Sequence, residues 1–256
     1  MTRIFDALRK AGSVSPPVAA PAVLPAPVSA VRAATEKAGG RPVERPAGIL
    51  PFHAAVDLPG DVVREMTGLR VSLEAELTER IPRVVMFAAS QGGEGTSTVA
   101  AQFARTLAND SRLRVLLADA HAHRPGYAPD GSPRAGRART PSGDGAAARN
   151  LDLLPLPGGL GPEHVLAPEV MREALSAVAS RYDWIVLDGP PVLESPDAGP
   201  LGEVADGVVV VVQAGRTKRP VLARSVDLLR RSGGRVIGIV LNRRRLEIPG
   251  FIYRRL

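Results

Sequence analysis

Apolar residues follow two repeating patterns from about residue 60 onwards. Segments with apolar residues every three or four positions predict helices at 61–77, 96–108, 168–180 and 219–232. Short, nearly continuous apolar runs predict buried strands: VVMFAA (84–89), RVLLAD (114–119), LDLLPL (151–156), WIVLD (184–188), GVVVVVQ (207–213) and RVIGIVL (235–241). Continuous apolar strands separated by helices are typical of a sheet that is covered on both faces. We therefore predict an α/β fold with a largely parallel sheet and helices on both faces.

The chain divides into four parts, and only one of them shows this pattern. Residues 1–11 place Ile4, Phe5 and Leu8 on one face of a short helix, which indicates a docking segment, with a frayed end as the alternative. The stretch 12–59 is rich in Pro and Ala and is expected to be a disordered linker. Residues 60–246 form the folded domain, with a mobile loop at 120–150, and 247–256 form a basic tail.

Composition narrows the class of protein. The chain has no cysteine, so disulfides and thiolate metal sites are excluded. The charged opening MTRIFDALRK does not resemble a signal peptide, and we expect a cytoplasmic protein. The net charge is +7, and 12 basic against 2 acidic residues lie from Ala214 onwards. This basic strip is either a solvated surface or a contact for an anionic partner or membrane. No stacking aromatics accompany the arginines, so we expect no nucleic-acid partner.

A glycine-rich turn joins the strand at 84–89 to the helix at 96–108, in the sequence FAASQGGEGTSTVAAQFARTLA. Such a turn lets successive main-chain N–H groups surround a phosphate at the positive end of a helix, and a hydroxyl there can bind Mg²⁺. We predict that this loop binds ATP or ADP with Mg²⁺. The candidate nucleotide-binding residues are Gly92, Gly93, Glu94, Gly95, Thr96, Ser97 and Thr98.

The loop departs from the phosphate-loop pattern GxxxxGK[ST] at two positions. Ser90 occupies the first glycine position, and Thr96 occupies the lysine position. The lysine supplies a full positive charge between the β- and γ-phosphates, which threonine lacks. The chain has only three lysines, Lys10, Lys37 and Lys218, and none is near the loop in sequence. No arginine stands out as a substitute.

Two strands end in aspartates that suit a metal ion. Asp119 closes the run RVLLAD and Asp188 closes WIVLD, where each carboxylate can reach the shell of an Mg²⁺ ion held by Ser97. The alternative for either aspartate alone is a turn or helix-capping role. If the protein is an active enzyme, Asp119 and Asp188 are the candidate catalytic residues.

At these motifs the sequence resembles the cytoplasmic tyrosine kinases of bacterial polysaccharide synthesis (BY-kinases), which are related to the MinD and ParA ATPases. The glycine-rich segment looks like the family's Walker A motif, RVLLADAHAHRP like Walker A′, and YDWIVLDGPPVLESPDAGPLGEVADGVVVVVQAGRTKR like the Walker B region. The resemblance implies the MinD/ParA-like P-loop fold. The segment VIGIVLNRRR is similar to the family's last strand, so Asn242 and Arg243 are expected near the adenine.

The departures from the family lie at chemically important positions. Thr96 replaces the Walker A lysine, His121 replaces the second aspartate of Walker A′, and Gly189 replaces the hydroxyl residue after the Walker B aspartate. The tail offers one candidate phosphoacceptor, Tyr253, where the family has several tyrosines. The family's ring-forming EXXRXXR motif, which would imply a homo-oligomer, is represented by Arg64, Thr67 and Arg70.

Three functional hypotheses follow. The leading one is a kinase-like protein of exopolysaccharide or capsule synthesis with weak or no phosphotransfer. It would regulate a membrane-bound chain-length or export partner, and through that partner lie peripherally at the inner face of the membrane. The first alternative is an active tyrosine autokinase that phosphorylates its tail or a partner. The second is a MinD/ParA-like positioning ATPase, although Gln91 stands where that family has its signature lysine. A binding module unrelated to polysaccharide is a further alternative.

Overall fold

The structure is a computed structural model of the whole chain, and it describes residues 49–52, 58–77, 80–121, 127, 150–156 and 168–243. All of these residues belong to one compact unit, Ala47–Leu256. The predicted docking segment, most of the linker and of the loop at 120–150, and the tail lie outside the described residues. These assignments stay predictions.

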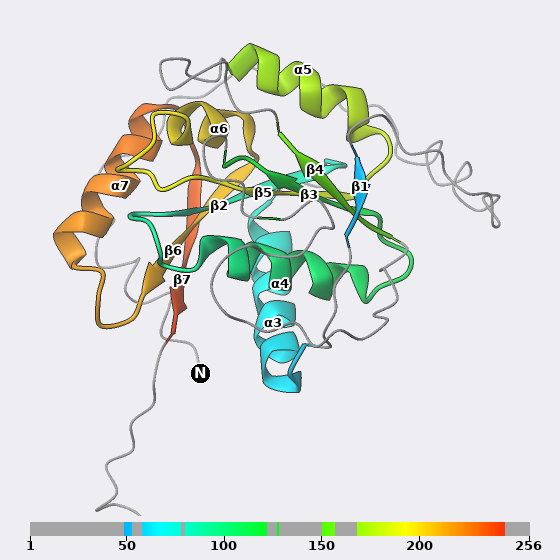
Figure 1. Cartoon of the computed structure of the whole chain (residues 1–256), viewed down its shortest axis with the longest axis horizontal. Helices are drawn as coiled ribbons and strands as arrows, with labels where there is room; N and C mark the ends of the chain where they lie inside the picture. The colour runs from blue at the N-terminus through cyan, green and yellow to red at the C-terminus, as the bar shows by residue number, and fades with distance from the viewer. Residues whose placement is uncertain are drawn as a thin grey trace, which may run out of the picture. The chain divides into compact units, whose positions relative to one another are not determined.

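A seven-stranded sheet forms the centre of the unit (Figure 1). The strand order is β1-β4-β3-β5-β2-β6-β7. Strand β1 is antiparallel to β4, and the other six strands are parallel to one another. The strands are β1 (Leu50–Pro51), β2 (Arg83–Ala89), β3 (Val115–Asp119), β4 (Leu151–Pro155), β5 (Trp184–Asp188), β6 (Gly207–Gln213) and β7 (Val236–Asn242).

Helices cover both faces of the sheet, which confirms the predicted α/β fold class (Figure 1). On one face lie α3 (Gly60–Glu76) and α4 (Thr96–Ala108). On the other lie α5 (Pro168–Ala179), α6 (Ala198–Val204) and α7 (Arg219–Arg231). None of the described helices is both long and apolar enough to span a bilayer.

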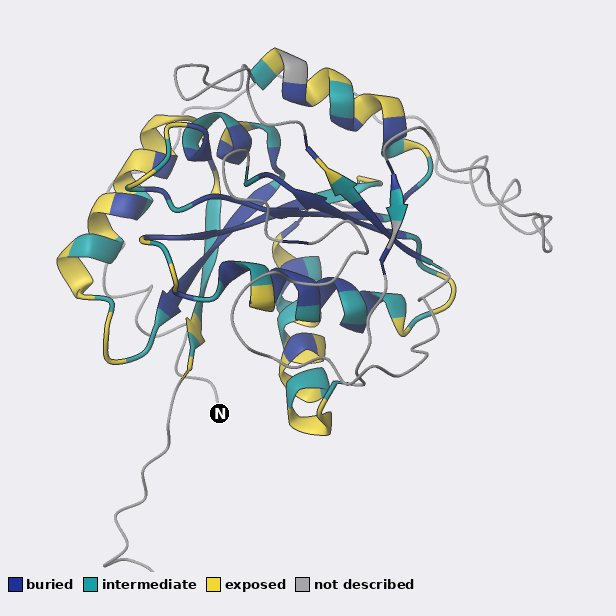
Figure 2. Cartoon of the chain, viewed as in Figure 1, coloured by how far each residue is buried: buried dark blue, intermediate teal, exposed yellow. Residues whose placement is uncertain are grey.

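The central strands are apolar at every position because alternate side chains enter two different cores. In β2, Val85 and Phe87 pack toward α3 and α4, whereas Met86 and Ala88 pack toward α6 and α7. The rings of Phe87 and Phe103 are 5.3 Å apart, which anchors α4 on the sheet. Figure 2 shows these strands as the most deeply buried part of the unit.

The predicted elements are confirmed with small shifts at their ends, but the sequence analysis missed β1 and α6. Strand β1 has only two residues, which is too short for a periodic signal. Helix α6 has the sequence AGPLGEV, and its two glycines and one proline have low helix propensity, so this segment was not predicted as a helix.

The order of the strands determines where a site forms. Because β2 to β7 are parallel, the carboxyl ends of β2, β3, β5, β6 and β7 lie at one edge of the sheet. The chain leaves β2 to form β3 on one side and later adds β6 on the other, and such a switch point is where open α/β sheets bind ligands. The predicted phosphate loop lies at this edge.

Candidate functional site

The phosphate loop, residues 90–97, connects β2 to α4 and follows a sharply curved path. Gly93 (φ 83°) and Gly95 (φ 97°) adopt left-handed conformations that glycine tolerates best. No described residue accepts a hydrogen bond from the main-chain N–H groups of residues 93–97. These groups and the N-terminus of α4 therefore form an open cradle for an anion.

Glu94 holds the loop in shape from within. Its buried carboxylate accepts hydrogen bonds from the N–H groups of Ser90 (2.8 Å) and Gln91 (3.1 Å) and from the hydroxyl of Thr217. The amide of Asn242 donates to the Glu94 carbonyl oxygen at 2.8 Å. The Glu94 side chain is thus occupied by the protein itself, and only its main-chain N–H is available to a ligand.

The lysine position of the loop carries no charge. Thr96 is buried in the first turn of α4. Lys218 is the sole lysine among the described residues, and it is exposed at the N-cap of α7. The site therefore lacks the lysine charge that a phosphate loop normally places beside the phosphates.

Two arginines, however, reach the loop from β7 and from the β6–α7 connection. The Arg243 guanidinium donates to the Gly93 carbonyl (3.1 Å) and to the Gln213 side chain (3.3 Å). Arg216 contacts the same Gln213 oxygen at 3.4 Å. Asn242 and Arg243, which were both predicted from the sequence, lie against the phosphate loop. Arg216 lies there too, although it was not predicted.

The metal-ligand candidates meet on the other side of the loop. Asp119 and Asp188 occupy the same register on the neighbouring strands β3 and β5. Together with His121 they bring potential ligand atoms within 4.8 Å of one another. His121 Nδ1 lies 3.3 Å from Asp119 and 3.6 Å from Asp188.

Asp188 supports the presence of a ligand at this point. Its side chain is fully buried, and the Ser97 hydroxyl, the Tyr127 phenol and His121 lie near it, but no hydrogen bond of good geometry to either carboxylate oxygen is found among the described residues. Such an unsatisfied buried carboxylate is costly unless a ligand completes it. The donor set of Ser97, Asp119 and Asp188 suits Mg²⁺, which prefers oxygen ligands. When bound, the metal would supply charge neutralisation for phosphate oxygens.

The electrostatics of this cluster are tightly linked. Burial raises the pKa of Asp188 to about 6, although the nearby charge of His121 and the Ser97 hydroxyl oppose the rise. Burial alone would lower the pKa of His121, but its hydrogen bond to Asp119 and the charges of Asp188 and Asp119 outweigh this and raise it. His121 therefore places a titratable imidazole beside both carboxylates.

Tyr127 covers the cluster and was not identified from the sequence. Its buried hydroxyl donates to the Ser97 carbonyl at 3.0 Å, and its ring packs edge-on against Phe52. Burial and the charges of Asp188 and Asp119 raise the pKa of this phenol well above its usual value, so it stays protonated. A lone tyrosine in a loop rich in Gly, Pro and Arg carries no sequence signal for this position.

The segment after β5 lies along the phosphate loop. The carboxylate of Glu194 accepts a hydrogen bond from the Gly92 N–H at 2.8 Å. The sequence analysis also missed this residue. At Gly189 a Cβ atom would lie 2.9 Å from the Phe87 carbonyl oxygen, so the hydroxyl residue of the related kinases does not fit here without a shift of the chain.

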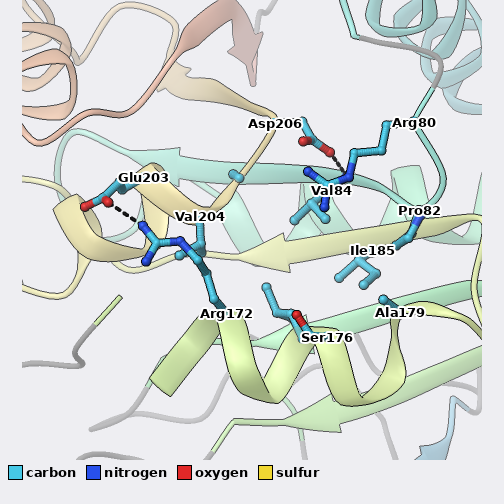
Figure 3. A pocket seen from close by; sticks show the side chains of 12 residues that line it. Arg80, Pro82, Val84, Arg172, Ser176, Ala179, Ile185, Glu203, Val204 and Asp206 are labelled. Carbon is cyan, nitrogen blue, oxygen red and sulfur yellow. Dashed lines mark hydrogen bonds and ion pairs between the residues drawn. The ribbon is translucent and has the colours of Figure 1, made fainter. Parts of the chain in front are cut away.

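A cavity of about 290 Å³ lies away from the loop, at the amino ends of the strands (Figure 3). Ile185 and Ala179 contribute apolar surface to it. Three of its four charged residues have partners: Arg172 pairs with Glu203, and Asp206 accepts from the Val84 N–H at 2.7 Å. This cavity contains none of the predicted site residues.

The remaining predicted residues are less informative. Thr98 is exposed in the first turn of α4. Tyr253 lies outside the described residues. Arg64, Thr67 and Arg70 all lie on α3, where the Thr67 hydroxyl bonds the Val63 carbonyl and Arg70 pairs with Glu74, so no ring contact is defined for them.

Comparisons with known proteins place this geometry in context. No family model matches the chain. It is 29% identical over 192 residues to the tyrosine-protein kinase YwqD of Bacillus subtilis, an alignment that covers 70% of this chain and 80% of YwqD. It is 28% identical over 216 residues to the succinoglycan biosynthesis transport protein ExoP of Rhizobium meliloti, covering 76% of this chain and 27% of ExoP.

The fold is also that of a solved kinase domain. The kinase domain of the Escherichia coli tyrosine kinase ETK superposes with a TM-score of 0.61 at 22% identity, covering 81% of this chain and 87% of that domain. This likeness concerns the fold, whereas the sequence relatives carry the family relationship. The chain is therefore a homologue of proteins named bacterial tyrosine-protein kinases.

Proposed function

We propose that the chain is a nucleotide-binding, kinase-like regulator of exopolysaccharide synthesis or export that transfers little or no phosphate. The observation that carries this proposal is Thr96 at the lysine position of an otherwise well-formed phosphate loop. The loop supplies binding geometry, but it lacks the charge that stabilises a transferring phosphoryl group.

Nucleotide binding is supported by the groups that remain. The N–H groups of residues 93–97 are open, and the buried Asp188 carboxylate is unsatisfied. Arg243 and Arg216 add positive charge beside Gly93. The chain's own residues would thus cradle the phosphates, hold the metal through Ser97, Asp119 and Asp188, and restrict solvent access through Tyr127.

The pathway and the partner are inferred from the relatives. ExoP is named as a succinoglycan transport protein, and the alignment covers only about a quarter of its length. The part of ExoP that this chain matches belongs to a larger transport protein, and we infer a comparable membrane-bound component as the partner of this chain. We propose that this chain binds such a chain-length or export protein and is held at the inner face of the membrane by it.

The second candidate is an active tyrosine autokinase. It is favoured by the retained pair Asp119 and Asp188, by the Ser97 hydroxyl at the start of α4, and by His121, which can exchange a proton at the position of the family's second aspartate. Arg216 or Arg243 would then have to provide the missing charge.

Phosphate transfer from radiolabelled ATP, measured beside calorimetric titration with Mg-ATP, separates the two. We expect the wild-type protein to bind without transfer and Thr96→Lys to gain transfer by about 100-fold or more, as expected for restoring a phosphate-stabilising group. Asn109→Lys is the matched control, because it adds the same charge to an exposed position at the far end of the same helix.

Wild-type transfer that disappears in Asp188→Ala would show an active kinase and contradict the leading proposal. Thermal unfolding of each variant checks that the buried position 96 accepts lysine. A folded Thr96→Lys protein that binds nucleotide without transfer would show that the missing lysine is not what limits this site.

A further inference from the structure

The phosphate loop has two halves that differ in how their N–H groups are used. At its start, carboxylates take three successive groups: Glu94 binds those of Ser90 and Gln91, and Glu194 binds that of Gly92. In the second half, residues 93–97 bond to no described acceptor. An anionic ligand therefore finds the second half open and meets the negative charge of Glu194 at the first.

Main-chain contacts fix the position of Glu194 beside the loop. The N–H of Val192 donates to the Ala89 carbonyl at 2.8 Å, and that of Leu193 donates to the Ser90 carbonyl at 3.2 Å. The segment after β5 is thus bonded to the end of β2 and the start of the loop. The carboxylate of Glu194 also lies so near that a Cβ atom at Gly92 would be 3.1 Å from it.

The direction of a bound nucleotide follows from the order of the strands. Asp119 and Asp188 end β3 and β5 on one side of β2, whereas Arg216 and Arg243 come from β6 and β7 on the other. A metal ion held by Asp119 and Asp188 would neutralise the charge of the terminal phosphates. The terminal phosphate therefore belongs on the β5 side, and the nucleoside on the side of the arginines.

Glu194 follows β5 and lies on the side of the terminal phosphate. There it would repel a γ-phosphate, and Thr96 offers no charge to offset that repulsion. The α- and β-phosphates would instead meet the open N–H groups and the two arginines. The buried Asp188 carboxylate, which lacks a hydrogen bond of good geometry among the described residues, supports a ligand beside the loop independently of the loop itself.

We propose that Glu194 makes this loop selective for nucleoside diphosphates over triphosphates, because its carboxylate holds the Gly92 N–H where a terminal phosphate would lie. This inference rests on the nucleotide binding proposed above and specifies whether the bound nucleotide carries two or three phosphates. Glu194 acts as a specificity-determining residue and needs no part in phosphotransfer.

The test is calorimetric titration of the full chain with Mg-ADP and with Mg-ATP. We expect the wild-type protein to bind Mg-ADP about fivefold more tightly, the ratio that one charge repulsion near water produces. Glu194→Gln should bind Mg-ATP about fivefold more tightly than wild type while its affinity for Mg-ADP changes less than about twofold. Glu173→Gln, which removes the same charge from an exposed position on α5, should leave the ratio unchanged.

Other outcomes contradict the inference in distinguishable ways. If the wild-type protein prefers Mg-ATP, or if Glu194→Gln changes both affinities equally, Glu194 does not set specificity although nucleotide binding stands. If neither nucleotide binds to the wild type or to Glu194→Gln, the proposed nucleotide binding itself is wrong. Because Glu194 is exposed, a thermal melt close to that of wild type is expected for the variant and checks its fold.

Discussion

Aspartates stand at both edges of the parallel sheet, and the two edges use them differently. At the amino edge, Asp183 and Asp206 precede β5 and β6. Each makes two hydrogen bonds to one residue at the start of a neighbouring strand. The N–H of Asp183 donates to the Arg114 carbonyl (2.8 Å), and the Asp183 carboxylate accepts from the Arg114 N–H (2.7 Å). Asp206 makes the same two bonds with Val84 (2.8 and 2.7 Å). At the carboxyl edge, Asp188 is buried with no such partner.

The comparison shows how function can be recognised in this fold. The amino edge contains a cavity of about 290 Å³ beside paired charges, so a cavity alone does not identify a binding site. The carboxyl edge contains open N–H groups and an unsatisfied carboxylate, which a folded protein tolerates where a ligand completes them. We therefore expect mutations at the two edges to change stability in opposite directions.

The largest effect is expected at the amino edge. Asp206→Ala leaves the Val84 N–H without its acceptor and should lower the free energy of unfolding by about 2–3 kcal/mol. Urea denaturation followed by circular dichroism measures this. Asp227→Ala, which removes an exposed aspartate from α7, is the control and should change stability by less than about 0.5 kcal/mol. Equal losses of stability in Asp206→Ala and Asp227→Ala would show that the Asp206 carboxylate stabilises the amino edge no more than an exposed carboxylate stabilises the surface.

A smaller effect of opposite sign is expected for Asp188→Asn. The pKa of Asp188 is raised to about 6, so the folded state holds this proton more tightly than the unfolded chain does. Its contribution to stability is therefore complete below about pH 4 and is lost as the pH rises through about 6. Asparagine carries no charge at any pH, so the variant should be more stable than wild type by about 2 kcal/mol at pH 7.5.

Denaturation at several pH values checks this prediction. The advantage of Asp188→Asn should shrink toward zero as the pH falls well below 3.8, where Asp188 is protonated in both the folded and the unfolded state. In Asp188→Asn, His121 loses a negatively charged neighbour, so the pKa of His121 should fall. NMR titration of the imidazole measures this change. A variant less stable than wild type at pH 7.5 would mean that Asp188 already has adequate partners.

The smallest effect is expected at the rim of the amino-edge cavity. Arg172 and Glu203 form an ion pair in which the side chains are 48% and 40% exposed. Because solvent screens such pairs, Arg172→Ala should cost less than about 1 kcal/mol. A double-mutant cycle with Glu203→Ala isolates the pair, and a coupling energy above about 1.5 kcal/mol would show that this edge depends on its surface charges as well.

The sequence predicted the fold well because its signals are local. Each central strand is a continuous apolar run, and α4 begins directly after the glycines of the loop, so strand, turn and helix are legible in one segment. Strand β1 and helix α6 lacked such signals, the first because it has two residues and the second because of its glycines and proline.

The site was predicted only as far as its local motifs extend. The glycine-rich loop, Asp119 and Asp188 were located from strand ends, and the structure gathers them at one edge. Glu194 and Arg243 meet the loop across 102 and 150 positions of sequence. Arg216 and Tyr127 likewise depend on tertiary contacts. One glutamate or arginine among many gives no sign of such a contact, so only the folded chain reveals it.

The contact between Gly95 and Asn242 has a consequence for protein engineering. A Cβ atom at position 95 would overlap the amide of Asn242, the same group that bonds the Glu94 carbonyl. Shortening residue 242 would remove this overlap, but the left-handed backbone at position 95 (φ 97°) would still strain any residue other than glycine. A library that varies the loop should therefore keep Gly95 and Asn242 together as a fixed pair and vary the positions around them.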